Sequence, residues 1–133
     1  MLLVKTKIGP SSIHGTGIFA DELIPKGTRI WEYREGVDSR FDDKFLETLP
    51  EPAQKQVLNY AYKNPRTGLY VLCGDDARFF NHSDTPNTED LEFDEGLVQG
   101  EGITIAAQDI QPGEEIVSDY RSFDATSRQK GIV

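Results

Sequence analysis

The residues best suited to chemistry stand in one short stretch, residues 78–87, which reads Arg-Phe-Phe-Asn-His-Ser-Asp-Thr-Pro-Asn. Phe79 and Phe80 favour burial, and the polar side chains of Asn81, His82 and Ser83 follow them directly. If these polar side chains follow the phenylalanines inward, each buried polar atom needs a hydrogen-bond partner. The pattern therefore indicates a polar pocket cut into a core. The alternative is a strand end followed by a turn, because Asn, Asp, Ser and Pro all favour turns.

Two further stretches bear on that choice. Residues 113–120 read Gly-Glu-Glu-Ile-Val-Ser-Asp-Tyr, and residues 13–20 read Ile-His-Gly-Thr-Gly-Ile-Phe-Ala. Together with residues 78–87, and in this order, they resemble the motifs of the SET-domain protein lysine methyltransferases. The string at residues 78–87 is the most specific of the three, and the Gly-x-Gly near the N-terminus is weak alone.

The N-terminal glycines also match the G-x-G-x-x-A pattern of dinucleotide-binding folds, with Glu35 about twenty residues further on. However, a Gly-Pro break at residues 9–10 precedes the first glycine where a strand is needed. Pro25 then arrives too early for a crossover helix, which needs roughly ten or more residues. We reject this interpretation and take Gly15 and Gly17 as places where the backbone bends or approaches a ligand closely.

The chain has 133 residues, of which 37% are hydrophobic and 28% charged, so we expect one globular domain, residues 1–133, with a sizeable core. Short apolar stretches separated by Gly and Pro predict a mainly β fold, with strands near residues 2–8, 28–33, 69–73, 92–98 and 102–107 and a turn at 94–96. Helical spacing over residues 42–62, broken at Pro50 and Pro52, predicts two helices. We expect a mobile tail at about 124–133.

The resemblance implies a SET-domain fold of several small sheets, with a short helical insert at about 41–63 and a knot-like threading of the two late motifs. It also implies S-adenosyl-L-methionine as cofactor and methyl transfer to the ε-amine of a protein lysine. The amine must be neutral to react, and with a pKa near 10.4 only roughly one lysine in a few thousand is neutral at pH 7. The site must therefore exclude water and hold the amine in place. No metal and no covalent enzyme intermediate is needed.

Two tyrosines are the candidate catalytic residues under this resemblance. Tyr120 ends the motif at residues 113–120 and matches the family's active-site tyrosine, as an orienting and electrostatic group. Tyr33 falls where many members place a second channel tyrosine, and its match is looser. A core tyrosine and a plain strand aromatic are the respective alternatives.

The resemblance also implies a set of cofactor-binding residues. Asn81 could accept a hydrogen bond from the cofactor's ammonium, and the backbone of His82 could contact adenine. Structural roles remain the alternative for several of the others, in particular an exposed loop for His14 and helix packing for Tyr60. The full predicted set is His14, Gly15, Thr16, Gly17, Tyr60, Arg78, Asn81 and His82.

The sequence departs from the family at its zinc-binding segment. Asp84 stands where many members have cysteine, and the single cysteine, Cys73, allows neither a cysteine-rich zinc cluster nor an internal disulfide. Of the residues after Tyr120, Phe123 is the only aromatic one, and it could cover the cofactor or the lysine channel, or simply pack the terminus. Ser118 stands where a bulky ring often limits the number of methyl groups, so its small side chain leaves room for more.

The net charge of −9 argues against a nucleic-acid partner and favours a basic, lysine-containing protein segment, histone-like or other, although acidity also serves solubility. The N-terminal apolar run is too short for a signal peptide and too charged for a membrane span. We therefore expect an intracellular protein, cytoplasmic, or nuclear in a eukaryotic or viral setting. A homodimer is an alternative to a monomer. The rival function is a catalytically inactive SET-like module that binds a basic peptide or the cofactor.

Overall fold

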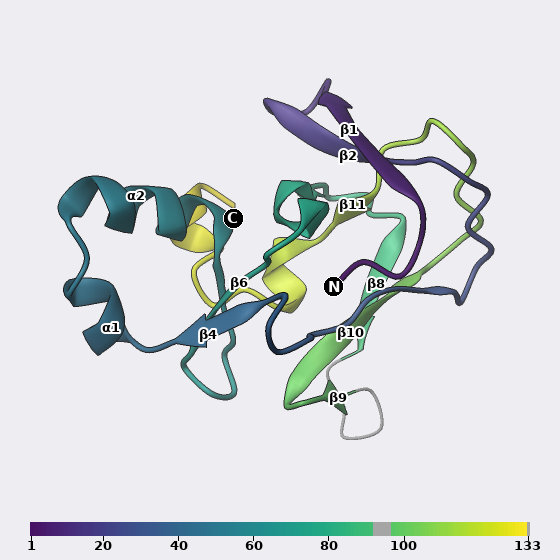
Figure 1. Cartoon of the computed structure of the whole chain (residues 1–133). Helices are drawn as coiled ribbons and strands as arrows, with labels where there is room; N and C mark the ends of the chain where they lie inside the picture. Colours follow the sequence, from purple (N-terminus) through teal and green to yellow (C-terminus); the bar gives the residue numbers. More distant parts are fainter. Residues whose placement is uncertain (92–96, 133) are drawn as a thin grey trace.

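The computed structural model describes residues 1–91 and 97–132 and shows several small β-sheets with a helical segment projecting at one end (Figure 1). The turn expected at residues 94–96, with the first part of the strand expected over 92–98, lies outside the described residues. Elsewhere short strands follow one another with turns between them. The prediction of a mainly β fold is confirmed.

The N-terminal hairpin joins β1 (Thr6–Pro10) to β2 (Thr16–Ala20) in antiparallel register, with Pro10 opposite Thr16. Gly15 lies in the connecting loop at φ +47°, a backbone conformation that glycine adopts without a steric cost. The strand expected over residues 2–8 starts later than predicted, because Leu2 forms only an isolated bridge to Trp31, and it continues through the expected Gly-Pro break to Pro10. This hairpin brings residues 11–16 to one edge of the molecule.

The main sheet has β10 (Glu101–Ala106) between β3 (Arg29–Trp31) and β8 (Thr88–Leu91), and β9 (Leu97–Val98) pairs with the first residues of β10. All of these pairings are antiparallel. The largest hydrophobic cluster is rich in fully buried isoleucines, each worth about 1.5–3 kcal/mol of burial: Ile18, Ile24, Ile30, Ile110 and Ile116.

A third sheet carries the helical insert. β6 (Tyr70–Leu72) lies between β4 (Ser39–Phe41) and β5 (Tyr62–Lys63), and α1 (Asp43–Glu47) and α2 (Glu51–Tyr60) connect β4 to β5. Asp42 caps α1, accepting from the backbone N of Phe45 at 2.9 Å. Pro50 precedes α2 and Pro52 stands in its first turn, where the missing N–H is tolerated. Both helices lie inside the segment predicted from the sequence.

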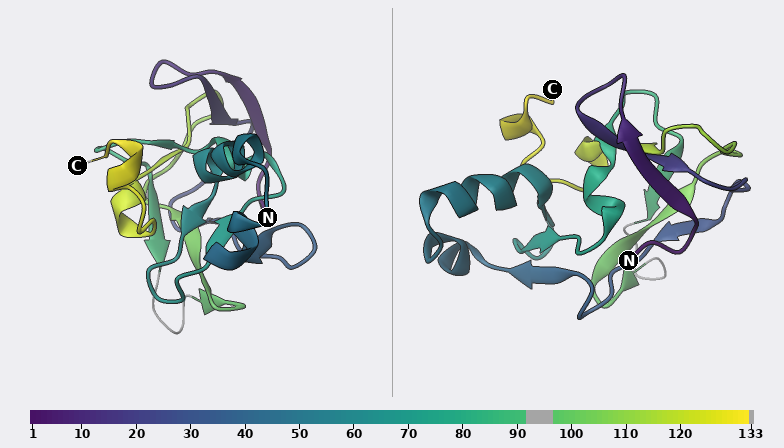
Figure 2. Two further views of the ribbon diagram at one scale, coloured as in Figure 1. Left: turned by 90° about the vertical axis from the view of Figure 1, so that its left-hand side faces the viewer. Right: turned by 45° about the horizontal axis from the view of Figure 1, so that its top comes forward.

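The remaining pair of strands joins the two late motifs. β7 (Asn81–His82) runs parallel to β11 (Val117–Ser118), with Asn81 opposite Val117 and His82 opposite Ser118. Short 3-10 helices flank the pair: η1 (Asp76–Phe79) before β7, and η3 (Tyr120–Ser122) after β11. A last 3-10 helix, η4 (Arg128–Lys130), lies beside the end of α2 in the views of Figures 1 and 2. In the described part of the chain, no helix is long and apolar enough to cross a bilayer.

Candidate active site

Asn87 locks the two late motifs together. Its side-chain nitrogen donates to the carbonyl of Glu115 at 2.8 Å, and its oxygen accepts from the buried N–H of Val117 at 2.9 Å. Thr88 adds a buried bond from its hydroxyl to the carbonyl of Val117 at 2.9 Å. These contacts satisfy backbone groups at a very short parallel strand pair that could not satisfy them alone. They fix β11 against the end of the motif at residues 78–87.

Tyr120 is held between these motifs by both its backbone and its ring. The hydroxyl donates to the carbonyl of Phe80, and the backbone N–H donates to Nδ1 of His82 at 3.1 Å. Burial, with a further contribution from the carboxylate of Asp124, raises the pKa of Tyr120 to about 12. The phenol is therefore neutral at ordinary pH and has a fixed direction.

His82 has a defined tautomer in this arrangement. Because Nδ1 accepts from the backbone of Tyr120, the ring proton of the neutral form must be on Nε2. Nε2 lies 3.1 Å from Oδ1 of Asp84, which accepts the hydrogen bond from its N–H. His82 thus supports the backbone of Tyr120 through its side chain, while its own backbone lies on β7.

Asn81 connects the same motifs to the N-terminal loop. Its amide nitrogen donates to Oε2 of Glu115 at 3.0 Å and to the carbonyls of His14 and Thr16 at 3.1 and 3.3 Å. Glu115 also accepts from the hydroxyl of Ser11 at 2.7 Å. Because the nitrogen of Asn81 is committed to protein acceptors, its Oδ1 is the atom that can accept from a ligand.

The absence of a side chain at Gly17 leaves room for Glu115. A Cβ added at Gly17 would lie 2.6 Å from Oε2 of Glu115, so the carboxylate would have to shift away from Ser11 and Asn81. The sequence-based interpretation expected a backbone contact with the cofactor here. The structure instead places Gly17 against Glu115, outside the lining of the cavity described next.

A large cavity of about 860 Å³ opens where the N-terminal loop, α2 and β7 meet, a volume within the range of cofactor-sized ligands. It brings together seven of the eight residues predicted to bind the cofactor, and Tyr120 with them. The predicted residues in its lining are His14, Gly15, Thr16, Tyr60, Arg78, Asn81, His82 and Tyr120.

Tyr60 and Arg78 lie side by side on this lining. The guanidinium of Arg78 lies 5.8 Å from the ring centroid of Tyr60, and its Nη2 donates to the carbonyl of Cys73 at 3.0 Å. Tyr60 is at the last turn of α2 and 38% exposed, so its ring is available to a ligand. Cys73 is buried, and burial raises the pKa of its thiol, which disfavours the nucleophilic thiolate form.

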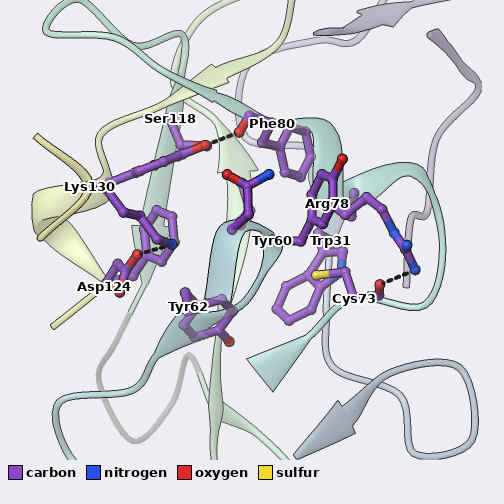
Figure 3. A pocket seen from close by; sticks show the side chains of 14 residues that line it. Trp31, Tyr60, Tyr62, Cys73, Arg78, Phe80, Ser118, Asp124 and Lys130 are labelled. Carbon is purple, nitrogen blue, oxygen red and sulfur yellow. Dashed lines mark hydrogen bonds and ion pairs between the residues drawn. The ribbon is translucent and has the colours of Figure 1, made fainter. Parts of the chain in front are cut away.

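A second, narrow cavity of about 70 Å³ adjoins the first and is shown in Figure 3. Six of its fourteen lining residues are aromatic, and Tyr60, Arg78, Phe80 and Tyr120 line both cavities. The rings around it are Trp31, Tyr60, Tyr62, Phe80, Tyr120 and Phe123. An aromatic slot of this size suits an unbranched apolar side chain with a polar end. Ser118, only 2% exposed, also faces it.

Tyr33 does not reach this cavity. It is 1% exposed, its hydroxyl donates to Glu35 at 2.7 Å, and Arg40 lies over its ring at 4.4 Å. It lies outside the lining of both cavities. Strand β3 ends at Trp31, so alternation along the strand does not carry Tyr33 to the same face. Trp31 lines the narrow cavity instead.

Sequence reasoning did not identify Trp31, Tyr62 or Lys130 as site residues. Tyr62 donates its hydroxyl to buried Glu101 at 3.0 Å and meets the rings of Trp31 and Phe123 edge-on, with centroids 6.4 and 5.2 Å away. Phe123, noted from the sequence as a possible cover, lines the narrow cavity. No local pattern marks the other three, because they lie outside the motifs. Across the described residues, no cluster of three or more His, Cys, Asp or Glu could hold a metal.

A small β protein with a cofactor-sized cavity joined to an aromatic slot is the class of molecule that these observations define. The family pattern of the SET domain matches residues 15–121. The chain therefore belongs to the SET-domain family, as its motifs predicted.

Curated relatives are similar over most of the chain. The identity is 29% over 124 residues with human Histone-lysine N-methyltransferase 2D, covering 92% of this chain and 2% of that protein. It is 33% over 116 residues with Histone-lysine N-methyltransferase trr of Drosophila melanogaster, covering 86% of this chain and 5% of that protein. The chain thus spans only a few per cent of the length of these relatives.

Solved structures share the fold. A Plasmodium falciparum protein, solved as a candidate histone methyltransferase, superposes with a TM-score of 0.61 at 26% identity, covering 90% of this chain and 95% of that chain. A mutant Polycomb Repressive Complex 2 of Chaetomium thermophilum superposes with a TM-score of 0.65 at 22% identity, covering 94% of this chain and 16% of that chain. The fold predicted from the motifs, a SET domain, is confirmed.

Proposed function

We propose that this domain transfers a methyl group from S-adenosyl-L-methionine to the ε-amine of a lysine in a protein. One observation carries the proposal: a cofactor-sized cavity and a narrow aromatic slot meet at Tyr120, so that two different ligands can present their reacting ends to each other. The related proteins named as histone-lysine methyltransferases support the same chemistry.

The residues of the large cavity fit this cofactor. The loop from His14 to Thr16 presents backbone groups to the cavity, and Oδ1 of Asn81 is an acceptor suited to the ammonium of an amino acid. His82 offers backbone polar groups, and Tyr60 with Arg78 offers a stacked planar surface for a base. When bound, the cofactor supplies an electrophilic methyl group on a positively charged sulfur.

The narrow cavity suits the acceptor lysine. Aromatic walls accept the methylenes of the side chain. Tyr120 remains a neutral phenol because its pKa is raised to about 12, so it orients the amine rather than removing its proton. The proton leaves to solvent, and the residues of the chain contribute mainly position and dipoles.

A basic segment of a protein, histone-like or other, is the substrate that we propose. The net charge of −9 attracts such a segment from a distance and disfavours nucleic acid. The names of the relatives point to histone lysines as one class to assay first.

The proposal is tested by titrating the domain with S-adenosyl-L-methionine in a calorimeter and then measuring transfer of labelled methyl to a lysine-rich protein. Saturable binding with label on lysine is the expected result. Binding without transfer to any lysine protein would favour the inactive peptide- or cofactor-binding module. No binding at all would contradict both functions. Asn81→Ala serves as the control that removes the acceptor from the large cavity.

A further inference from the structure

Lys130 from the C-terminal tail reaches into the region where the two cavities meet (Figure 3). Its Nζ donates to Oδ2 of Asp124 at 2.7 Å and to the carbonyl of Ala61 at 2.6 Å. The same nitrogen lies 5.5 Å from the ring centroid of Tyr120. A primary ammonium group therefore already occupies a position beside the candidate catalytic tyrosine.

The position that Lys130 fills is a built binding site. The side chain of Asp124 is 1% exposed, and its other oxygen accepts from the backbone of Lys63 at 3.1 Å and from Thr126 N and Oγ1 at 2.9 and 2.7 Å. These bonds hold the carboxylate in one orientation. A buried carboxylate, a carbonyl and an aromatic face together recognise an ammonium ion by charge, direction and cation–π attraction.

Lys130 is held less firmly than Asp124, the residue that it binds. Asp124 belongs to the segment fixed by a bond from the N–H of Ala125 to the carbonyl of Lys63 at 2.8 Å. Lys130 stands on the short helix η4 (Arg128–Lys130), which buries none of its residues, and its side chain is 21% exposed. A side chain on a single turn that buries no residue can leave without disturbing the core. The expected mobility of the tail stays a prediction, and these contacts oppose it in this conformation.

We propose that Asp124, the carbonyl of Ala61 and the Tyr120 ring form the site that receives the substrate's lysine as an ammonium ion, and that Lys130 is an internal competitor for it. This inference rests on the proposed function and adds a regulation to it. Nearly all substrate lysines are protonated at pH 7, so a carboxylate at this point captures the abundant form. The amine then loses its proton further along the slot.

The competing explanation is that the ion pair between Lys130 and Asp124 only holds the C-terminal segment in place. The two explanations predict opposite changes in the affinity for a lysine peptide when Lys130 is replaced. If Lys130 competes, Lys130→Met frees the site and lowers the dissociation constant of a lysine peptide. If Lys130 instead holds the C-terminal segment where it supports peptide binding, Lys130→Met raises the dissociation constant of the peptide. An occupancy of about nine in ten by Lys130 corresponds to about a tenfold gain in affinity.

The probe is a short fluorescent peptide with one central lysine between neutral residues, titrated in the presence of S-adenosylhomocysteine and followed by polarisation. We expect Lys130→Met to bind it several-fold more tightly and Asp124→Asn to bind it more weakly. The Asn side chain keeps the oxygen that accepts from Lys63 and Thr126. Arg128→Met is the matched control, since it removes an exposed cation from the same turn and should leave affinity unchanged. A peptide with norleucine in place of lysine should respond to none of these changes.

Weaker peptide binding by Lys130→Met, or affinity equal to that of the unaltered protein, would overturn the inference. If Asp124→Asn unfolds at a much lower temperature than the unaltered protein, the change in peptide affinity of Lys130→Met alone still separates the two explanations. Methyl transfer is measured on the same variants to separate the two claims. If the unaltered protein transfers methyl groups but Lys130→Met gains no peptide affinity, only the claim that Lys130 competes with the substrate lysine is rejected. A gain in peptide affinity without transfer in any variant rejects only the catalytic function.

Discussion

The hydroxyl of Tyr120 donates to the carbonyl of Phe80, a residue 40 positions earlier in the chain. Phe80 directly precedes Asn81, whose amide holds the N-terminal loop and Glu115 in place. One hydrogen bond therefore connects the candidate catalytic group to the strand that carries the candidate cofactor ligand. Tyr120 and Phe80 each line both cavities, so this contact lies where the cavities meet.

Tyr120→Phe should lower kcat by about a hundredfold, a typical loss when one positioned polar group is removed from a reacting centre. Cofactor affinity should change little, because the ring and the backbone bond to His82 remain. Labelled methyl transfer and calorimetry measure the two quantities. Tyr70→Phe is the matched control, a buried tyrosine that lines neither cavity. Unchanged kcat in Tyr120→Phe would remove Tyr120 from the mechanism.

Asn81→Ala should weaken cofactor binding by about ten- to a hundredfold, since a hydrogen bond to a charged ligand group is worth about 1.5–3 kcal/mol. The change also releases the carbonyls of His14 and Thr16 from their donor, which loosens the loop along the cavity. Titration with S-adenosylhomocysteine gives the affinity without turnover. An affinity within twofold of the unaltered protein, roughly 0.4 kcal/mol, would contradict the assignment of the large cavity.

Asn87→Ala should lower the free energy of unfolding by about 2–4 kcal/mol, because it leaves the buried N–H of Val117 and the carbonyl of Glu115 without their partners. Urea denaturation measures the effect. Asn59→Ala, at an exposed position on α2, should change stability by less than about 0.5 kcal/mol. Similar small losses for both variants would show that Asn87 does not lock the motifs.

Ser118→Phe should reduce the number of methyl groups added to one lysine. Ser118 is 2% exposed and faces a cavity of about 70 Å³, so a phenyl ring there takes the space that a methylated amine would need. Mass spectrometry of a product peptide at long reaction times counts the methyl groups. The same product distribution in both proteins would place the limit on methylation elsewhere.

Activity should rise with pH from about 7 to 9, close to tenfold per unit in kcat/KM, because the neutral fraction of the substrate amine rises tenfold per unit below its pKa. Ionisation of Tyr120 does not lower the activity in this pH range. With its pKa raised to about 12, the phenol is ionised in only about one molecule in a thousand at pH 9. A flat profile would show that loss of the amine proton does not limit the observed rate.

The residues predicted from motifs stand inside short stretches that the sequence itself marks. Asn81 and His82 form the very short strand β7, and Tyr120 closely follows the equally short β11. The family resemblance of those stretches predicted that the three residues share a site, and all three line the large cavity. The division of the insert at Pro50 follows from the missing N–H of proline, a local effect that the sequence displays directly.

The residues that the sequence did not reveal depend on contacts between distant segments. Trp31 and Tyr62 reach the slot only because β3 and β5 lie on different sheets that face it, and Tyr62 is oriented by Glu101, 39 positions later. Tyr33 was placed in the channel by the family resemblance, within a strand expected over residues 28–33. The strand ends at Trp31, and the ring of Tyr33 is buried in the core. Gly17 was expected to bring the backbone close to a ligand, but its close neighbour is the side chain of Glu115.

The most direct test is transfer of a labelled methyl group from S-adenosyl-L-methionine to a peptide with a single lysine, compared with the same peptide carrying norleucine. The account predicts label on the lysine peptide alone, with the signal reduced by about a hundredfold in Tyr120→Phe. Saturable cofactor binding with no label on lysine, at any pH from about 7 to 9, would contradict it.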